Sequence, residues 1–317
     1  VKFQTFQAEK LVTASARKVD YQIGMTGSHE TQLEMLRRLQ LAPADFDELF
    51  RYCRERDIIF MSTPFDEESA DVLDMLGMEI FKIPSGEITN RPLIEHIAKK
   101  GKPILLSTGM SSMEEVERAV SWIKAVKKNL VSRSESFPHF FYSLPVLLHC
   151  VSSYPANFED LNLRAIKTMK DACKLQVGFS DHSRGIEASV AAVAIGASVI
   201  EKHFTLDKGM EGPDHVASLD VKELKELIVA IRNIEVALGD GIKRPVASEM
   251  ETRTLVRKSI VATRNIKAGE KIGLNGIGIK RPGTGISPEY RDRVACMVAA
   301  HPIAADSVIA WEDIKDA

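Results

Sequence analysis

The chain has 317 residues, with 42 lysines and arginines against 44 aspartates and glutamates, so its formal net charge is −2. A chain without a net basic field is not built to bind nucleic acid or an anionic membrane. Hydrophobic residues make up 44% and charged residues 27%, which excludes disordered and fibrous classes. The four cysteines lack CxxC spacing, so we expect neither a disulfide framework nor a structural zinc site. No apolar run approaches the roughly 20 residues that span a bilayer, and no signal-peptide pattern is present, so we expect a cytoplasmic protein.

Short apolar runs typical of β-strands recur along the chain, each followed by a longer segment with helical periodicity. They lie at residues 1–6, 58–61, 80–83, 104–106, 146–148, 177–179 and 199–200. Residues 113–126 show the helical pattern clearly, because Ser112 and Glu115 have capping-box spacing before an amphipathic run. This repetition predicts an α/β fold with parallel strands, either an open sheet or a closed (β/α)8 barrel.

The polar residues that end these runs favour the barrel. The last two runs, for example, end in Ser180-Asp181-His182 and Glu201-Lys202-His203. Functional groups at the carboxyl ends of six strands fit a barrel mouth better than the single crevice of an open sheet. A barrel needs eight strands and only seven runs are present, so we expect the first strand to precede Val1.

The pattern changes near residue 240, where Gly239 and Gly241 end the last long helix and a polar, proline-containing stretch follows. We predict a barrel domain at residues 1–240, a linker at 241–257 and a small β-rich domain at 258–317. Strands of this second domain are expected at residues 259–262, 277–279 and 307–310. Residues 130–144 read as a surface insertion to which we assign no chemistry.

Two histidines, His182 and His203, end the last two predicted strands. Because these strands are neighbours in order, the two imidazoles can meet above the mouth. Two neutral imidazoles with water make an open site for a divalent cation. Hydrogen-bonded histidines in a polar mouth are the alternative, and position alone does not separate the two.

Lysines also fall within the predicted strands, where burying an unpaired cation is costly. Lys82, and after it Lys2, fit a pocket for an anionic substrate, whereas Lys202 lies between Glu201 and His203 and can face outward. Hydroxyl groups near strand ends add neutral donors suited to phosphate and carboxylate groups: Thr63, Ser85, Ser107 and Ser180.

Acidic residues and motif absences complete the pattern. Glu87 follows Ser85-Gly86 and suits either a general base or a cap for the helix that begins after Asn90. Residues 211–215, Glu-Gly-Pro-Asp-His, form a loop that either contacts a polar substrate or is a plain surface turn. No GxGxxG follows a strand, and no P-loop or GxSxG motif occurs, so nucleotide-binding and serine-hydrolase interpretations lose their usual support.

Several motifs in order resemble those of one family. They are Val1-Lys2-Phe3-Gln4, Ser62-Thr63-Pro64-Phe65-Asp66, Lys82-Ile83-Pro84-Ser85-Gly86-Glu87, Ser107-Thr108-Gly109-Met110, His149-Cys150-Val151-Ser152-Ser153-Tyr154-Pro155, Gly178-Phe179-Ser180-Asp181-His182, Glu201-Lys202-His203-Phe204-Thr205-Leu206-Asp207 and Glu211-Gly212-Pro213-Asp214-His215. The sequence resembles the sialic acid (nonulosonate) synthases. The segment Lys280-Arg281-Pro282-Gly283-Thr284-Gly285-Ile286 resembles the signature of that family's C-terminal antifreeze-like (SAF) domain. We therefore expect a (β/α)8 TIM barrel followed by a small SAF domain.

The resemblance implies a transferase that condenses phosphoenolpyruvate with an N-acetylated amino sugar. The methylene carbon of phosphoenolpyruvate attacks the aldehyde of the open-chain sugar, water adds to the resulting oxocarbenium, and phosphate leaves by C–O cleavage. By the same resemblance, His182 and His203 hold Mn²⁺ or Mg²⁺, which polarises the aldehyde. Phosphoenolpyruvate binds at positions that match Lys2, Thr63, Lys82, Ser85, Ser107 and Ser180, and the sugar at Gln4, Tyr154 and Asp214.

Two further positions carry implied roles. Glu87 matches a carboxylate that handles protons or the attacking water, which makes it a catalytic candidate with Lys82 and the two histidines. Arg281 matches a SAF-domain arginine that reaches the N-acetyl group in the partner subunit's site of a domain-swapped homodimer. Two departures stand out: the family's first strand, with its own glutamate, is absent here, so we expect a processed or incomplete chain, and Ser152 stands where some members carry Asn.

The sugar is narrowed only in part. N-acetylmannosamine would give N-acetylneuraminate, and 2,4-diacetamido-6-deoxy sugars would give legionaminate or pseudaminate. The loop at 211–215 favours the neuraminate or legionaminate branch. The alternatives are another phosphoenolpyruvate-dependent aldol synthase of the 3-deoxy-aldulosonate type, which would need an arginine-rich second phosphate pocket, and a non-catalytic carbohydrate-binding remnant.

Overall fold

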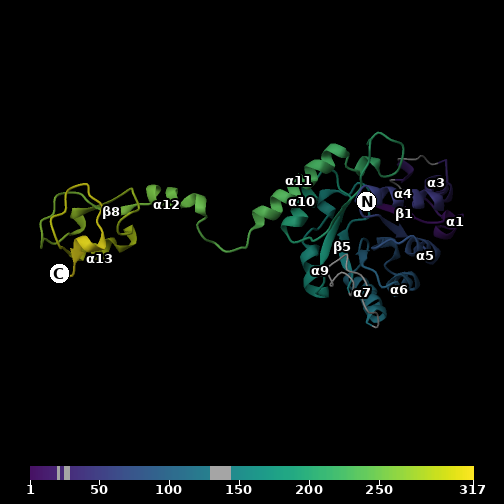
Figure 1. Cartoon of the computed structure of the whole chain (residues 1–317), viewed down its shortest axis with the longest axis horizontal. Coiled ribbons are helices and arrows are strands. Elements are labelled where there is room, and N and C mark those ends of the chain that lie inside the picture. The colour runs from purple at the N-terminus through teal and green to yellow at the C-terminus, as the bar shows by residue number, and fades with distance from the viewer. Residues whose placement is uncertain (20–21, 25–28, 129–143) are drawn as a thin grey trace. The chain divides into compact units, whose positions relative to one another are not determined.

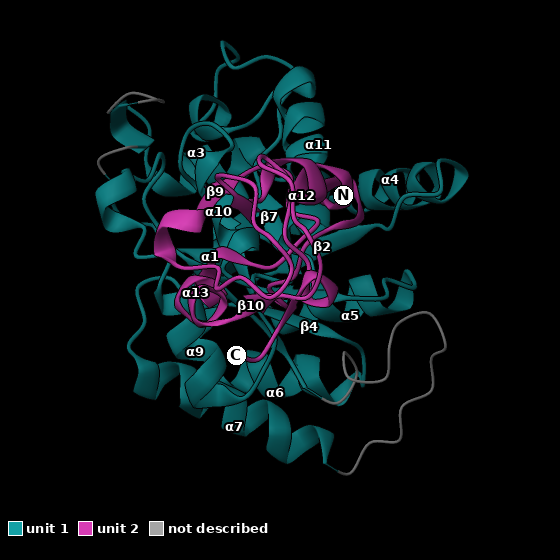
Figure 2. Cartoon of the chain, turned by 90° about the vertical axis from the view of Figure 1, so that its left-hand side faces the viewer, with its two compact units in different colours: residues 1–239 teal, residues 240–317 magenta. Residues whose placement is uncertain are grey.

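The computed structural model describes residues 1–19, 22–24, 29–128 and 144–317. The chain divides into two compact units, residues 1–239 and 240–317 (Figure 2). Each unit has its own cluster of buried apolar side chains. Within the described ranges, no helix has both the length and the apolar character that crossing a membrane requires. The insertion predicted at residues 130–144 lies, except for Leu144, outside the described residues.

The first unit is built on one sheet of seven parallel strands whose spatial order follows their order in the chain. The strands are β1 (Lys2–Thr5), β2 (Met61–Pro64), β3 (Phe81–Ile83), β4 (Ile104–Ser107), β5 (Val146–Cys150), β6 (Val177–Asp181) and β7 (Ile200–Lys202). Each of the seven predicted strands overlaps one of these, although the second, at 58–61, shares only Met61 with β2. Sequential parallel order with a helix between neighbours is the arrangement of a curled α/β barrel wall.

Helices cover the outer face of this sheet (Figure 1). They are α1 (Ala8–Leu11), α3 (Gln32–Leu39), α4 (Pro43–Glu55), α5 (Glu67–Met75), α6 (Arg91–Lys99), α7 (Met113–Lys127), α9 (Ala165–Cys173), α10 (Glu187–Ala194) and α11 (Val221–Leu238). The expected capping box starts α7, since Ser112 accepts from the amide of Glu115 and Glu115 accepts from that of Ser112. The face of α7 that carries Val116 and Ile123 is buried, as the periodicity predicts.

Alternation along the strands separates two layers of side chains. Phe81 and Phe179 belong to the large apolar cluster shared with the helices. Leu105, Val146 and Leu148 form a separate cluster inside the curled sheet. Further along each strand, the next inward-facing side chains lie at the carboxyl end of the sheet. Many of these side chains are polar.

The boundaries of three strands, β2, β6 and β7, lie further toward the C-terminus than we predicted. We predicted the second strand at residues 58–61, but β2 begins at Met61, because Ile58 and Ile59 are about half exposed and follow Asp57 in a left-handed conformation with φ of 54°. Strands β6 and β7 continue through Asp181 and Lys202. Charged residues at the carboxyl ends therefore lie inside the ladder, where a pattern of apolar residues does not reveal them.

The second unit contains α12 (Met250–Val256), β8 (Ser259–Ala262), β9 (Ile277–Lys280), α13 (Arg291–Cys296), β10 (Val298–Ala299) and β11 (Ile314–Lys315), with β8 antiparallel to β9 and β10 antiparallel to β11. The strand predicted at residues 307–310 is wrong. The segment makes only one isolated antiparallel bridge to β8, between Val308 and Val261, because Ile309 donates to Ile260 of β8 but accepts from Ile286 of another segment. Helix α12 lies in the expected linker and is exposed throughout. Because no face of it is buried, the sequence has no amphipathic pattern there from which to predict it.

Candidate functional site at the mouth of the sheet

A cavity of about 400 Å³ opens at the carboxyl ends of the strands. The site residues predicted from the sequence that it brings together are Lys2, Gln4, Thr63, Lys82, Ser85, Ser107, Tyr154, Ser180, His182 and His203. Most of them occupy inward-facing strand positions or follow such a position by two residues. The alternation that packs the interior therefore also aims these polar groups at one point.

Glu201 also lines this cavity and contacts three of the predicted residues, although the sequence did not single it out. Its carboxylate is 2.9 Å from Lys2 Nζ and 3.3 Å from Lys82 Nζ, and it accepts a 2.6 Å hydrogen bond from Ser180 Oγ. Glu201 and Ser180 are direct partners in the β6–β7 ladder. The alternation of side chains along the strand could have identified Glu201. If Lys202 faces outward, Glu201 and His203 both face inward.

The charge of Lys82 depends on its burial and on the carboxylate of Glu201. Burial lowers the pKa of Lys82 to about 8, although Glu201 acts in the opposite direction. Burial alone would raise the pKa of Glu201, but Lys82 and Lys2 reverse this and hold it below its usual value. Two cations share one carboxylate, so the cluster of Lys2, Lys82 and Glu201 keeps a positive charge at neutral pH and suits an anionic ligand.

Two hydroxyl groups in the cavity are buried and unpaired. Thr63 Oγ1 and Ser107 Oγ have no hydrogen-bond partner among the residues that the structure describes, and each residue is 2% exposed. Ser85 differs, because its Oγ accepts from the amide of Gly109 at 3.0 Å and lies 3.1 Å from Cys150 Sγ. A buried hydroxyl without a partner is costly, so Thr63 and Ser107 are candidate donors to a bound ligand.

The two predicted histidines also line this cavity and lie next to each other. Their ring centroids lie 5.5 Å apart, and the ring of Tyr154 stacks 4.2 Å from that of His182. His182 Nδ1 is 2.6 Å from the carbonyl oxygen of Val151. Burial lowers the pKa of His182, and burial together with the neighbouring His182 lowers the pKa of His203 to about 4. Both imidazoles are therefore neutral at pH 7.

This donor chemistry fits a divalent cation. With Nδ1–H bonded to a backbone carbonyl, His182 carries its lone pair on Nε2, which lies 3.3 Å from Ser180 Oγ; this is the usual tautomer for a metal-ligating imidazole. Across the described ranges, no three His, Cys, Asp or Glu side chains gather into a closed metal site. An ion held by these imidazoles would therefore complete its coordination with water or substrate oxygens, which is the open arrangement of catalytic sites.

Four other predicted or considered residues lie outside the cavity lining. Asp214 Oδ2 is 3.7 Å from His203 Nδ1, and burial raises the pKa of Asp214. Glu87 accepts from Asn90 Nδ2 at 2.7 Å, and Asn90, rather than Glu87 as the capping alternative had it, is the residue that caps α6. Lys202 pairs with Asp181, consistent with the outward alternative. Arg281 is exposed and belongs to the second unit.

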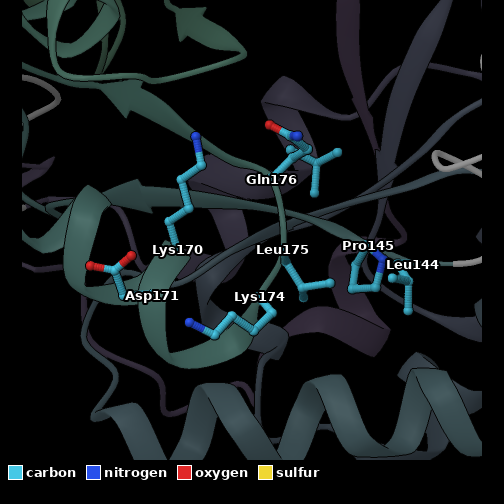
Figure 3. Close-up of a pocket in the computed structure, with 8 residues that line it drawn as sticks. Leu144, Pro145, Lys170, Asp171, Lys174, Leu175 and Gln176 are labelled. Atoms are coloured by element: carbon cyan, nitrogen blue, oxygen red, sulfur yellow. The ribbon is translucent and has the colours of Figure 1, made fainter.

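A second cavity, of about 450 Å³, lies at the amino ends of β5 and β6 (Figure 3). Its charged side chains, Lys170, Asp171 and Lys174, are all exposed and come from the end of α9 and the turn after it. The amino end of a barrel wall is the face where side chains serve stability, and the carboxyl end is where they serve chemistry. We therefore place the candidate site at the mouth.

Comparisons with known proteins match this arrangement. A family model described as the NeuB family covers residues 1–243. The chain belongs to the NeuB family. A SAF domain model covers residues 257–315. The NeuB barrel and the C-terminal SAF domain confirm the family and the fold class that the sequence motifs indicate, and the family comprises nonulosonate synthases.

Named NeuB relatives are similar over nearly the whole chain. An N,N'-diacetyllegionaminic acid synthase of Campylobacter jejuni is 46% identical over 98% of this chain and 89% of its own length. A protein of the same name from Legionella pneumophila is 42% identical over 99% of this chain and 86% of its own. Among solved structures, an N-acetylneuraminic acid synthetase from Leptospira borgpetersenii, in complex with citrate, superposes with a TM-score of 0.66 at 36% identity, covering 79% of this chain and 78% of that one.

Proposed function

We propose that this protein condenses phosphoenolpyruvate with a 2,4-diacetamido-6-deoxy sugar to give a legionaminate-type nonulosonate and phosphate. The similarity to two proteins named as diacetyllegionaminic acid synthases supports this choice of sugar over N-acetylmannosamine. The observation that carries the proposal is the convergence of a buried lysine, Lys82, a half-buried one, Lys2, and two unpaired hydroxyls beside a pair of neutral imidazoles.

Phosphoenolpyruvate carries a phosphate and a carboxylate, and the lysine side of the cavity matches both groups. Lys2 and Lys82 supply charge-assisted hydrogen bonds, which are stronger than neutral ones. Thr63 and Ser107 supply the neutral donors that lack a partner, and Ser85 and Ser180 lie beside them. Glu201 holds the two ammonium groups together, so the site is arranged before the ligand binds.

The sugar would lie on the histidine side, where Gln4 and Tyr154 line the cavity and Asp214 stands beside His203. His182 and His203 would hold a divalent cation, Mn²⁺ or Mg²⁺. When bound, such an ion supplies Lewis-acid polarisation of a carbonyl oxygen. The raised pKa of Asp214 suits a carboxyl group that exchanges a proton with a sugar hydroxyl.

Arg281 enters the proposal through assembly. The resemblance described above implies that the SAF-domain arginine acts in the partner subunit of a homodimer, over the N-acetyl group of the sugar. If so, Arg281→Ala raises the KM for the sugar far more than the KM for phosphoenolpyruvate. An equal rise in both constants would contradict that assignment.

The proposal is tested by following phosphate release from phosphoenolpyruvate in the presence of Mn²⁺. A 2,4-diacetamido-6-deoxy sugar, N-acetylmannosamine and arabinose 5-phosphate are supplied in parallel, and product masses are read. We expect release with the diacetamido sugar and a product of nonulosonate mass, and loss of turnover in His182→Ala and His203→Ala. Release with arabinose 5-phosphate, or sugar binding without phosphate release, would overturn the proposal.

A further inference from the structure

A buried ion pair lies directly behind the two histidines, on the face of the sheet that is turned away from the cavity. Asp181 and Lys202 are the residues immediately before His182 and His203, and their charged groups are 2.9 Å apart. The side chain of Lys202 is 3% exposed and that of Asp181 is fully buried. The two residues are direct partners in the β6–β7 ladder.

Both carboxylate oxygens of Asp181 accept hydrogen bonds. Ser183 donates to Oδ1 from its amide at 2.8 Å and from its hydroxyl at 2.6 Å, and Ser189 of α10 donates to Oδ2 at 2.6 Å. The ammonium group of Lys202 also donates to the carbonyl of Ser183. The network therefore ties together the end of β6, the turn that follows it, the helix behind it and the end of β7.

Stability alone does not call for a charged pair here. The neighbouring outward positions on the same two strands are the apolar Phe179 and Ile200, which pack against the helices. A buried ion pair is commonly no more stabilising than an apolar pair of similar size, because both charges lose their hydration. What an ion pair adds is geometric specificity, because its two charged groups meet only at one register and one spacing of the two strands.

We propose that Asp181 and Lys202 are positioning residues, which hold His182 and His203 at the spacing at which both imidazoles address one ligand. Each histidine is one peptide unit from its charged neighbour, so the register fixed by the pair sets the 5.5 Å separation of the rings. The inference deepens the proposed function, on which it rests for the identity of the ligand as a divalent cation.

The test uses the full chain with both charges removed, Asp181→Asn/Lys202→Met, so that neither partner is left buried alone. We expect the thermal midpoint to stay within about 5 °C of the unchanged protein, because the pair is replaced rather than broken. We expect the dissociation constant for Mn²⁺, measured by titration calorimetry, to rise about 10- to 100-fold, as for other groups that orient metal ligands. The matched control is Asp74→Asn/Lys102→Met, which removes a 2.6 Å ion pair elsewhere on the first unit and should leave that constant unchanged.

A second readout does not require metal. With ¹³Cε1-labelled histidine in the metal-free protein, the signals of His182 and His203 are assigned from their Gln variants. In the double variant both signals should move, while those of the other six of the eight histidines stay in place. If the unchanged protein binds no Mn²⁺, the metal part of the proposed function fails and these signals still decide the positioning role.

A milder variant covers the case in which the double variant does not fold. Ser189→Ala removes one hydrogen bond to Asp181 Oδ2 and leaves the pair itself intact. It should weaken Mn²⁺ binding about 2- to 5-fold and shift the same two histidine signals in the same direction. Unchanged histidine signals in a folded double variant, or in Ser189→Ala if the double variant is unfolded, would overturn the inference.

Discussion

The unpaired hydroxyls of Thr63 and Ser107 lower the stability of the ligand-free protein, and in the proposed site they would donate to phosphoenolpyruvate. A buried polar group without a partner costs about 1–3 kcal/mol. Thr63→Val and Ser107→Ala should therefore keep or raise the free energy of unfolding, by up to about 1 kcal/mol. The same changes should raise the KM for phosphoenolpyruvate about tenfold, because each removes a hydrogen bond to an anion. Urea denaturation and steady-state kinetics measure the two effects separately.

Thr108→Val is the matched control for this pair. Thr108 is buried like its neighbour Ser107, but its hydroxyl donates to the carbonyl oxygen of Leu148 at 3.0 Å. Its replacement should lower the free energy of unfolding by about 1 kcal/mol and leave the KM unchanged. Equal losses of stability in Thr63→Val and Thr108→Val would show that Thr63 has a partner in the folded protein.

The lowered pKa of Lys82 predicts a pH dependence. In the free protein Lys82 is protonated below about pH 8 and neutral above it. Only the protonated form attracts an anion, so kcat/KM for phosphoenolpyruvate should be level below pH 8 and fall about tenfold per pH unit above it. In Lys82→Arg the cation persists at higher pH, and the fall near pH 8 should disappear. The same break in both profiles would assign it to a different group.

At the scale of single elements, Gly178 in β6 keeps the last two strands together. A Cβ at this position would lie 2.4 Å from the carbonyl oxygen of Val199, which accepts the ladder bond from Phe179. We expect Gly178→Ala to lower the free energy of unfolding by about 1–3 kcal/mol, because the added methyl must push β7 away from β6. Gly86→Ala, where nothing lies within 4 Å, should change it by less than about 0.5 kcal/mol. Similar losses in both variants, measured by urea denaturation, would contradict this account.

The strands of the first unit were predictable because an apolar run marks each of them and parity orders the faces. Lys2 with Gln4, and Ser180 with His182, fall on the inward face by spacing alone. The contacts between these side chains were not predictable. Glu201 and Lys2 are 199 residues apart in the chain, and no local pattern encodes their ion pair. The short, turn-rich second unit was less predictable, because outside the β8–β9 and β10–β11 ladders its backbone bonds connect scattered single residues.

At the scale of the whole molecule, the two units have separate cores and should lose structure separately. Ile260 is fully buried in the core of the second unit. We expect Ile260→Ala to destabilise that unit by about 2–5 kcal/mol. Hydrogen exchange read by mass spectrometry should then accelerate in residues 258–317 and stay unchanged in residues 1–239. Equal acceleration in both units would mean that they unfold as one.

The site itself was predicted as a set of residues more fully than as a set of roles. Inward-facing residues at the strand ends converge as expected, because the carboxyl ends of all the parallel strands lie at the same edge of the sheet. The role of Glu87 could not be read from its position, since a carboxylate after a strand serves a helix cap as readily as a reaction. Arg281 belongs to a different unit, and sequence spacing contains no information about which surface that unit meets.

The contact between Lys2 and Glu201 also has a temporal side. During synthesis at about 5–20 residues per second, roughly 10 to 40 s pass between the appearance of one residue and that of the other, given their separation of 199 residues. Until β7 has been made, the two lysines lack the acid that draws them together. A nascent chain therefore acquires the cluster of Lys2, Lys82 and Glu201 only with β7, and a translation product that stops before residue 201 carries the two lysines without their shared carboxylate.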